Sequence, residues 1–275
     1  MSFVAGDIGM YSIDAEVYHS DPVPGGSLSS TGARTILRSP AHFRAARKKA
    51  AKTPTEEMMF GTVAHRLVLG AGEKVAVLDM DSWRTDEAKA FKADALARGA
   101  TPILRKAYTV AEAMAAAVHE HPIAGKLVQG GEPEMTMVWA QDGIMCRAMA
   151  DYVTPEGIVD YKTTRSVDLY AIRRAFWNYS YHQQDAFYRR GFREVAGVER
   201  PTFKFIFQEK TFPYVVRVVS LDSASVTEGR LLNERAIEIY RDCEALEEWP
   251  GYDEEAVISL SAHANEFDDE GDEEE

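Results

Sequence analysis

Apolar residues recur at helical spacing through the first half of the chain. Met59, Val63 and Leu67 are each four residues apart, which places them on one face of a helix. This helix is expected to open near Pro54 and to stop near Gly70, because proline suits a first turn and glycine a C-terminal cap. Further helices are predicted at residues 39–49, 86–98 and 106–127.

Near residue 134 the pattern changes to short apolar runs separated by turn residues. Strands are predicted at residues 135–139, 145–152 and 157–161, with turns at 141–143 and 154–157. Two helices (167–177 and 181–195), two strands (202–208 and 214–220) and a long helix (224–246) follow. The order predicts an α+β fold, α/β in the broad sense, in which helices flank a central mixed or antiparallel sheet.

The chain is expected to form a single domain over residues 1–264. A helical N-terminal part, about 27–130, precedes the sheet and its helices, about 131–250. Residues 265–275 are expected to be a disordered acidic tail, because blocks of like charge are usually solvated. The aromatic residues between the two later helices, Phe176, Trp177, Tyr179 and Tyr181, are interpreted as core residues rather than as a platform for stacking bases.

The net charge of −13 argues at first against a nucleic-acid partner. However, residues 266–275 contain eight acidic and no basic residues, so the rest of the chain carries −13 + 8 = −5. Basic clusters at residues 44–49 and at Arg189-Arg190 remain available to line a DNA channel. The charge therefore does not exclude nucleic acid as a substrate.

Composition also narrows the class of protein. No apolar run is long enough for a membrane span, and residues 1–7 lack the pattern of a signal peptide, so a cytoplasmic protein without a membrane partner is expected. Cys146 and Cys243 are the only cysteines. Two thiols favour neither a disulfide framework nor an iron–sulfur cluster, which needs four thiolates.

The candidate chemistry lies in two neighbouring predicted strands. Asp160 and Lys162 are two residues apart, so on a strand they face the same way, about 6–7 Å apart. If the strands form a hairpin, Asp151 approaches Asp160 across it. Two carboxylates and an ammonium would then converge on one face of the sheet. The alternative interpretation of such an Asp-x-Lys triplet is a solvated surface ion pair without a catalytic role.

These groups suit phosphodiester hydrolysis. Carboxylate oxygens bind Mg²⁺, which polarises a phosphoryl group and lowers the pKa of a bound water. An ammonium such as that of Lys162 orients the water and stabilises the negative charge that develops. The backbone carbonyl of Tyr161 lies between the two side chains and is a further candidate ligand.

The wider sequence resembles the nuclease domain of exonuclease VIII (RecE type), a relative of lambda-type exonucleases in the PD-(D/E)XK superfamily. The resemblance spans residues 10–249 and rests on four segments: Gly61-Thr62-Val63-Ala64-His65, Cys146-Arg147-Ala148-Met149-Ala150-Asp151, Asp160-Tyr161-Lys162-Thr163-Thr164 and Tyr181-His182-Gln183-Gln184-Asp185-Ala186-Phe187-Tyr188. The chain departs from the family at two positions, since Ala150 replaces a proline and Met149 an arginine.

The resemblance implies roles for these residues and a PD-(D/E)XK core. Asp151 and Asp160 would bind metal with Lys162 as the catalytic lysine, and the other implied site residues are His65 and Glu134 beside the metal and Gln184 and Tyr188 in the catalytic centre. Ordinary helix packing is the alternative interpretation of Gln184 and Tyr188, and a core or surface histidine that of His65.

The resemblance also implies the activity and its setting. The expected enzyme is a Mg²⁺-dependent exonuclease, with Mn²⁺ as a substitute, that digests double-stranded DNA ends from 5′ to 3′ and leaves 3′ overhangs for phage-type recombination. Expected partners are further copies in a trimeric or tetrameric ring and a single-strand annealing protein. Two alternatives stay open: an endonuclease or single-strand nuclease using the same site, and a catalytically silent DNA-binding scaffold.

Overall fold

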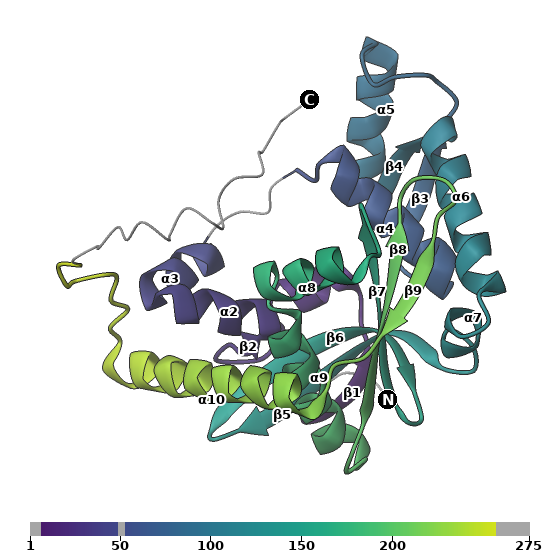
Figure 1. The fold of residues 1–275 in the computed structure, drawn as a ribbon. Coiled ribbons are helices and arrows are strands. Elements are labelled where there is room, and N and C mark those ends of the chain that lie inside the picture. Colours follow the sequence, from purple (N-terminus) through teal and green to yellow (C-terminus); the bar gives the residue numbers. More distant parts are fainter. Residues whose placement is uncertain (1–6, 49–52, 257–275) are drawn as a thin grey trace, which may run out of the picture.

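A seven-stranded mixed sheet forms the centre of the computed structural model, which describes residues 7–48 and 53–256 (Figure 1). The strands follow the order β1-β5-β6-β7-β8-β9, with β2 paired to β6. Their bounds are β1 Gly9–Ser12, β2 Leu28–Ser29, β5 Glu132–Gln141, β6 Ile144–Thr154, β7 Gly157–Thr164, β8 Thr202–Glu209 and β9 Val216–Val219. The β7–β8 and β2–β6 pairs are parallel and the others antiparallel. The predicted mixed sheet is confirmed.

One face of the sheet carries the larger core. The helices that cover it are α2 (Ser30–Arg38), α3 (Pro40–Lys48), α8 (Leu169–Asn178), α9 (Tyr181–Ala196) and α10 (Ser223–Leu246). The β8 residues Phe203, Phe205 and Phe207 alternate onto this face, as a strand buried on one side requires. Gly191 of α9 lies so close to β5 that an added Cβ would be 2.6 Å from the Trp139 ring.

The opposite face is covered by α4 (Glu56–Leu69), α6 (Arg105–Glu120) and α7 (Ala124–Leu127). Tyr161 and Ile206 point into this second core. A parallel pair of strands, β3 (Lys74–Leu78) and β4 (Ala100–Leu104), packs beside α4 and α6, with α5 (Asp86–Ala97) next to it. The N-terminal part is therefore not purely helical.

Local sequence explains the bounds of α4. The Thr55 side chain accepts a hydrogen bond from the backbone N–H of Met58, and Glu56 and Glu57 occupy the first turn, where the helix dipole favours acids. Gly70 ends the helix with a left-handed φ of 78°. The helix predicted between Pro54 and Gly70 is thus present.

The helix predicted at residues 106–127 is interrupted, which corrects that expectation. His121 caps a new start, because its Nδ1 accepts hydrogen bonds from the backbone N–H groups of Ile123 and Ala124. Pro122 has no N–H to continue α6. The short strands β1 to β4 and the helices α1 (Ala15–His19) and α2 were not predicted.

Two remaining expectations concern the tail and the membrane. The predicted acidic tail, residues 265–275, lies outside the described residues. Among the residues that are described, no helix has the length and apolar character needed to cross a bilayer. Cys146 and Cys243 are buried free thiols.

Candidate active site

The candidate site lies where β6 and β7 separate. Their antiparallel ladder ends at the pair Tyr152–Val159, so Asp151 and Asp160 are the next residues and lie opposite one another. The backbone N–H of Tyr161 donates to Asp151 Oδ2 at 2.9 Å in place of a strand partner. Asp151 and Asp160 therefore lie at the open end of the β6–β7 hairpin, away from its turn, as the sequence predicted.

The alternation of side chains along β6 changes at Asp151. Ala150 and Val153 both pack in the larger core, whereas Tyr152 packs in the second one. The facing residue on β5 is Glu134, which lies between the pairs Met135–Ala150 and Pro133–Tyr152. Glu134 has a φ of 52°, a conformation uncommon outside glycine. A local distortion of β5 and β6 thus turns Asp151 toward the open end of the β6–β7 hairpin, where Asp160 lies.

Glu134 lies against a glycine turn. Its Oε1 would be 2.7 Å from a Cβ added at Gly72, where φ is 114°. Burial raises the pKa of Glu134, and the negative charges of Asp151 and Glu73 raise it further. Because Gly72 has no side chain, the Glu134 carboxylate fits against it, close enough to Asp151 for the two charges to interact.

Asp160 is the most deeply buried acid of this group, with 1% of its surface exposed. Its Oδ2 lies 2.6 Å from Lys162 Nζ, and its Oδ1 accepts a 2.7 Å hydrogen bond from Gln184 Nε2 of α9. Burial raises the pKa of Asp160 to about 6, partly offset by the Lys162 ammonium. A solvated surface ion pair is excluded as the interpretation of Asp160 and Lys162.

Lys162 keeps its charge in this setting. Burial lowers its pKa, but the carboxylates of Asp160 and Asp151 outweigh that effect, and the pKa is raised above its usual value. The ammonium also lies 5.1 Å from the ring centroid of Tyr181, within the range of a cation–π contact. The result is a protonated amine held between two acids and an aromatic face.

His65 extends from α4 toward the same hairpin end. Its Nδ1 is 3.5 Å from Asp151 Oδ2, and its ring packs edge-on against Tyr161 with centroids 5.0 Å apart. Burial lowers the pKa of His65 to about 4, and the charge of Lys162 contributes. The imidazole is therefore neutral near neutral pH, the form that binds metal ions.

Gln184 and Tyr188, one helical turn apart on α9, have different surroundings. Gln184 contacts Asp160 directly. Tyr188 is buried in the larger core with its ring near Phe203, although Asp160 and Asp151 still contribute to raising its pKa after burial. The structure thus brings Gln184 to the acids, while Tyr188 packs in the core behind it.

The donor set fits a hard divalent ion. Among the described residues, no three His, Cys, Asp or Glu side chains are grouped as a metal cluster, but Mg²⁺ commonly takes only one or two carboxylates and keeps several waters. Asp160 Oδ2 is buried without a well-oriented hydrogen bond in the described part of the chain, beside the Lys162 ammonium. The backbone N–H of Tyr161 points to Asp151, and in a strand the carbonyl of the same residue lies along the same edge.

Comparison with known families agrees with this geometry. A family model described as "PDDEXK-like domain of unknown function (DUF3799)" matches residues 29–259. The chain belongs to this family. The match spans all the candidate residues, from His65 of α4 to Tyr188 of α9. PD-(D/E)XK nucleases generally use divalent metals, so the DUF3799 match and the oxygen donor set point to the same class of chemistry.

The fold of this DUF3799 member also matches a solved structure. A crystal structure from Eubacterium rectale, named "Putative exonuclease", aligns with a TM-score of 0.61 and 15% identity, covering 91% of this chain and 97% of the other. At that identity the similarity concerns the fold. A comparison with curated proteins finds no match. Family and fold together support a nuclease of PD-(D/E)XK type.

Two of the four aromatic residues that were predicted to lie in the core do so. Phe176 is buried there and Tyr181 packs against it, while the Tyr181 ring also contacts Lys162. Trp177 and Tyr179, also assigned to the core, are 63% and 59% exposed. Helical spacing from the buried Ile172 and Phe176 would have shown that Trp177 points elsewhere.

Proposed function

We propose that this protein is a Mg²⁺-dependent exonuclease that hydrolyses double-stranded DNA from an end, in the 5′-to-3′ direction. The observation that carries the proposal is the convergence of Asp151, Asp160 and Lys162 where the β6–β7 ladder ends. The DUF3799 family and the fold of the Eubacterium rectale protein support the nuclease class. The end specificity and the polarity rest on the resemblance to RecE-type enzymes.

Each residue has a role that follows from its surroundings. Asp151, Asp160 and the Tyr161 carbonyl would hold the ion, which supplies Lewis acidity and a water of lowered pKa when bound. Lys162 stabilises the negative charge that develops on the phosphate. Gln184 fixes the carboxylate of Asp160 by its hydrogen bond.

Further residues act at the margin of the site. The neutral imidazole of His65 restrains Asp151 and offers a nitrogen donor to the ion. Glu134 adds negative charge behind Asp151. Tyr188 follows Gln184 by one helical turn and packs in the larger core, and it is proposed to position Gln184 through α9. Mn²⁺ is expected to replace Mg²⁺, because both accept carboxylate and water ligands.

The setting of the enzyme is also a proposal. A cytoplasmic role in phage-type recombination would pair this exonuclease with a single-strand annealing protein that takes the exposed 3′ strand. A trimeric or tetrameric ring around DNA would allow basic residues to face the pore and acids to face outward. The recombination role, the annealing partner and the ring are all supported by the resemblance to RecE-type and lambda-type exonucleases.

Digestion of end-labelled linear duplex tests the proposal. With Mg²⁺, the wild type should release nucleotides first from the 5′ label, and Lys162→Ala should lose most turnover, roughly 100-fold or more, while still binding DNA. Circular duplex should stay intact; its cleavage would indicate an endonuclease. Unchanged digestion by Lys162→Ala would overturn the site assignment. Binding without metal-dependent release in the wild type would favour a silent scaffold.

A further inference from the structure

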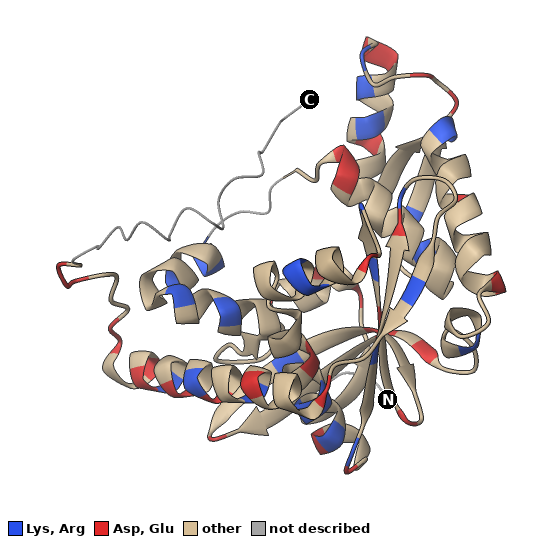
Figure 2. Cartoon of the chain, in the orientation of Figure 1, with Lys and Arg blue, Asp and Glu red and all other residues tan. Residues whose placement is uncertain are grey.

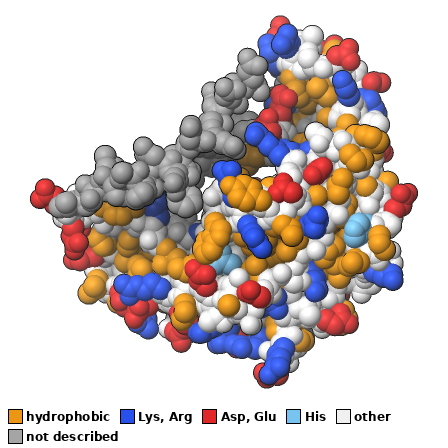
Figure 3. All heavy atoms as spheres, viewed as in Figure 1, with side chains coloured by type: hydrophobic (Ala, Val, Ile, Leu, Met, Phe, Trp, Pro, Cys, Tyr) orange, Lys and Arg blue, Asp and Glu red, His pale blue; other side chains and the backbone are white. Residues whose placement is uncertain are grey.

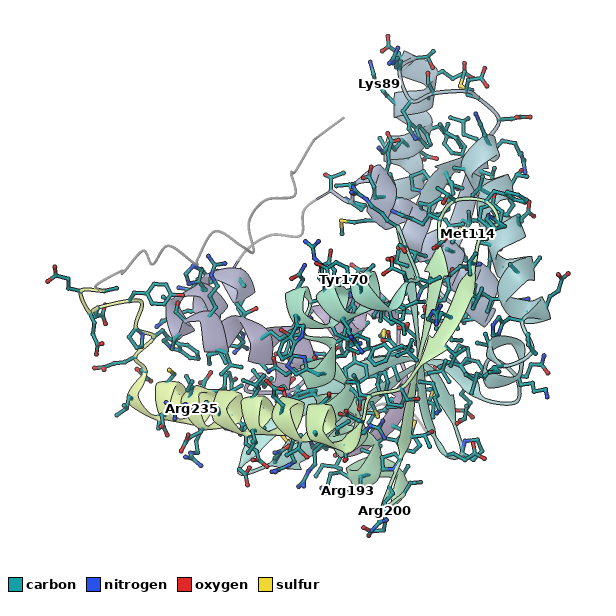
Figure 4. The ribbon with its side chains drawn as sticks, in the orientation of Figure 1. Lys89, Met114, Tyr170, Arg193, Arg200 and Arg235 are labelled. Carbon is teal, nitrogen blue, oxygen red and sulfur yellow. The ribbon has the colours of Figure 1, made fainter. Side chains whose placement is uncertain are left out.

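The outer face of α8 combines exposed aromatic rings with arginines. Ile172 and Phe176 turn inward to the larger core. Tyr170, Arg173, Arg174 and Trp177 follow the spacing i, i+3, i+4, i+7 and are all exposed; at about 100° per residue they fall on one face of the helix. We call these four residues the α8 platform. Figure 4 shows Tyr170 projecting from α8 away from the sheet.

The charge of the α8 platform is not neutralised. Within the described residues, neither Arg173 nor Arg174 forms an ion pair with a carboxylate; Arg174 lies instead over the Tyr170 ring at 5.9 Å. By contrast, the basic pair Arg189-Arg190, a candidate channel lining in the sequence, is ion-paired with Asp185 and Glu194. Figure 2 shows red and blue interspersed along α10, and Figure 3 shows basic and hydrophobic side chains adjoining over the α8 region.

The C-terminal end of the α8 platform is followed by aromatic residues that reach the candidate active site. The Trp177 ring rests on the buried His182 with centroids 5.3 Å apart. Two residues on, Tyr179 stacks on Tyr181 at 5.5 Å, and Tyr181 in turn contacts Lys162. Helix α8 also follows directly after β7, the strand that carries Asp160. A ligand that extends beyond the C-terminal end of the platform would reach Tyr179 and Tyr181, and next to them Lys162.

We propose that the α8 platform binds unpaired nucleotides of a DNA strand beside the active site, an inference that rests on the proposed nuclease function. Aromatic rings bind nucleobases through their faces, and arginines between them bind the phosphates. In an intact duplex the base faces are covered by neighbouring pairs, so exposed rings gain little there. Tyr170 and Trp177 are about 10 Å apart along the helix, with both arginines between them.

Binding in EDTA, where hydrolysis stops, tests this proposal with a labelled single-stranded oligonucleotide. Trp177→Ala should weaken binding roughly 5- to 150-fold, the usual contribution of one stacked base, whereas Trp177→Phe should retain most of it. The matched control is Leu231→Ala on α10, an exposed hydrophobic residue outside the platform, which should bind as the wild type does. The loss in Trp177→Ala should be smaller for blunt duplex than for the single strand.

Equal single-strand affinity of Trp177→Ala and wild type would overturn the proposal, as would an equal loss for single strand and duplex. The results also distinguish a failure of the platform proposal from a failure of the proposed nuclease function. If wild type digests DNA with Mg²⁺ but Trp177→Ala binds normally, the platform is wrong and the nuclease stands. If the platform binds single strands and no condition yields hydrolysis, the nuclease function is wrong instead.

Discussion

At the scale of single residues, the site balances burial against charge. Asp160 is buried, yet Lys162 and Gln184 hold its carboxylate from two sides. A buried acid with one ammonium beside it remains costly to ionise, and the pKa of Asp160 is accordingly raised to about 6. A divalent ion would offset this cost, because Asp151 adds a second negative charge and only one ammonium, that of Lys162, is present.

This balance predicts a pH dependence of metal binding. The proton stays on Asp160 until the pH rises through about 6, and the neutral acid is a poor ligand. Affinity for Mn²⁺ should therefore be full near pH 8 and should fall below pH 6 by about tenfold per unit. Titration calorimetry at several pH values measures this, and an affinity that stays flat down to about pH 5 would contradict the assigned ligand.

At the scale of elements, α9 must lie close to its neighbours for Gln184 to reach Asp160. At Gly229 of α10, an added Cβ would be 2.1 Å from the backbone oxygen of His182. Only a residue without a side chain allows the two helices to approach so closely. The close packing of α9 against α10 thus fixes the helix from which Gln184 reaches Asp160.

Glycine substitutions test this packing. Gly229→Ala should lower the melting temperature, because overpacking costs about 1–3 kcal/mol, and should reduce turnover through Gln184. Gly61→Ala on α4 is the matched control, since nothing lies within 4 Å of its added Cβ and alanine favours the helix by about 0.5–1 kcal/mol. Scanning calorimetry compares them; equal melting temperatures would show that the close approach is not required.

Local signals predicted these elements and the hairpin site, because alternation and turn residues are visible in sequence. Asp160 and Lys162 share a face through the period of the strand alone. The distortion at Glu134 and Asp151 was not predictable, since it arises from pairing between distant strands. Likewise β3 and β4 gain their stability from packing on α4 and α6, a tertiary effect that short segments do not reveal.

At the scale of the whole molecule, positive charge is concentrated locally although the net charge is negative. The net charge is −13, yet α8 beside the site carries two exposed arginines and no acid. On α10, by contrast, Glu234 and Glu238 pair with Arg230 and Arg235. The fold thus allows an acidic protein to present a basic, aromatic surface next to the buried Asp160 and the half-buried Asp151.

The most direct test of the central claim is Mn²⁺ binding, followed by electron paramagnetic resonance, in wild type, Asp151→Asn, Asp160→Asn and the control Glu248→Gln. Glu248 follows α10 and is exposed, away from the hairpin. The account predicts that wild type and Glu248→Gln bind Mn²⁺ alike, while each aspartate variant loses at least about tenfold in affinity. Equal binding by all four proteins would contradict a metal site shared by Asp151 and Asp160.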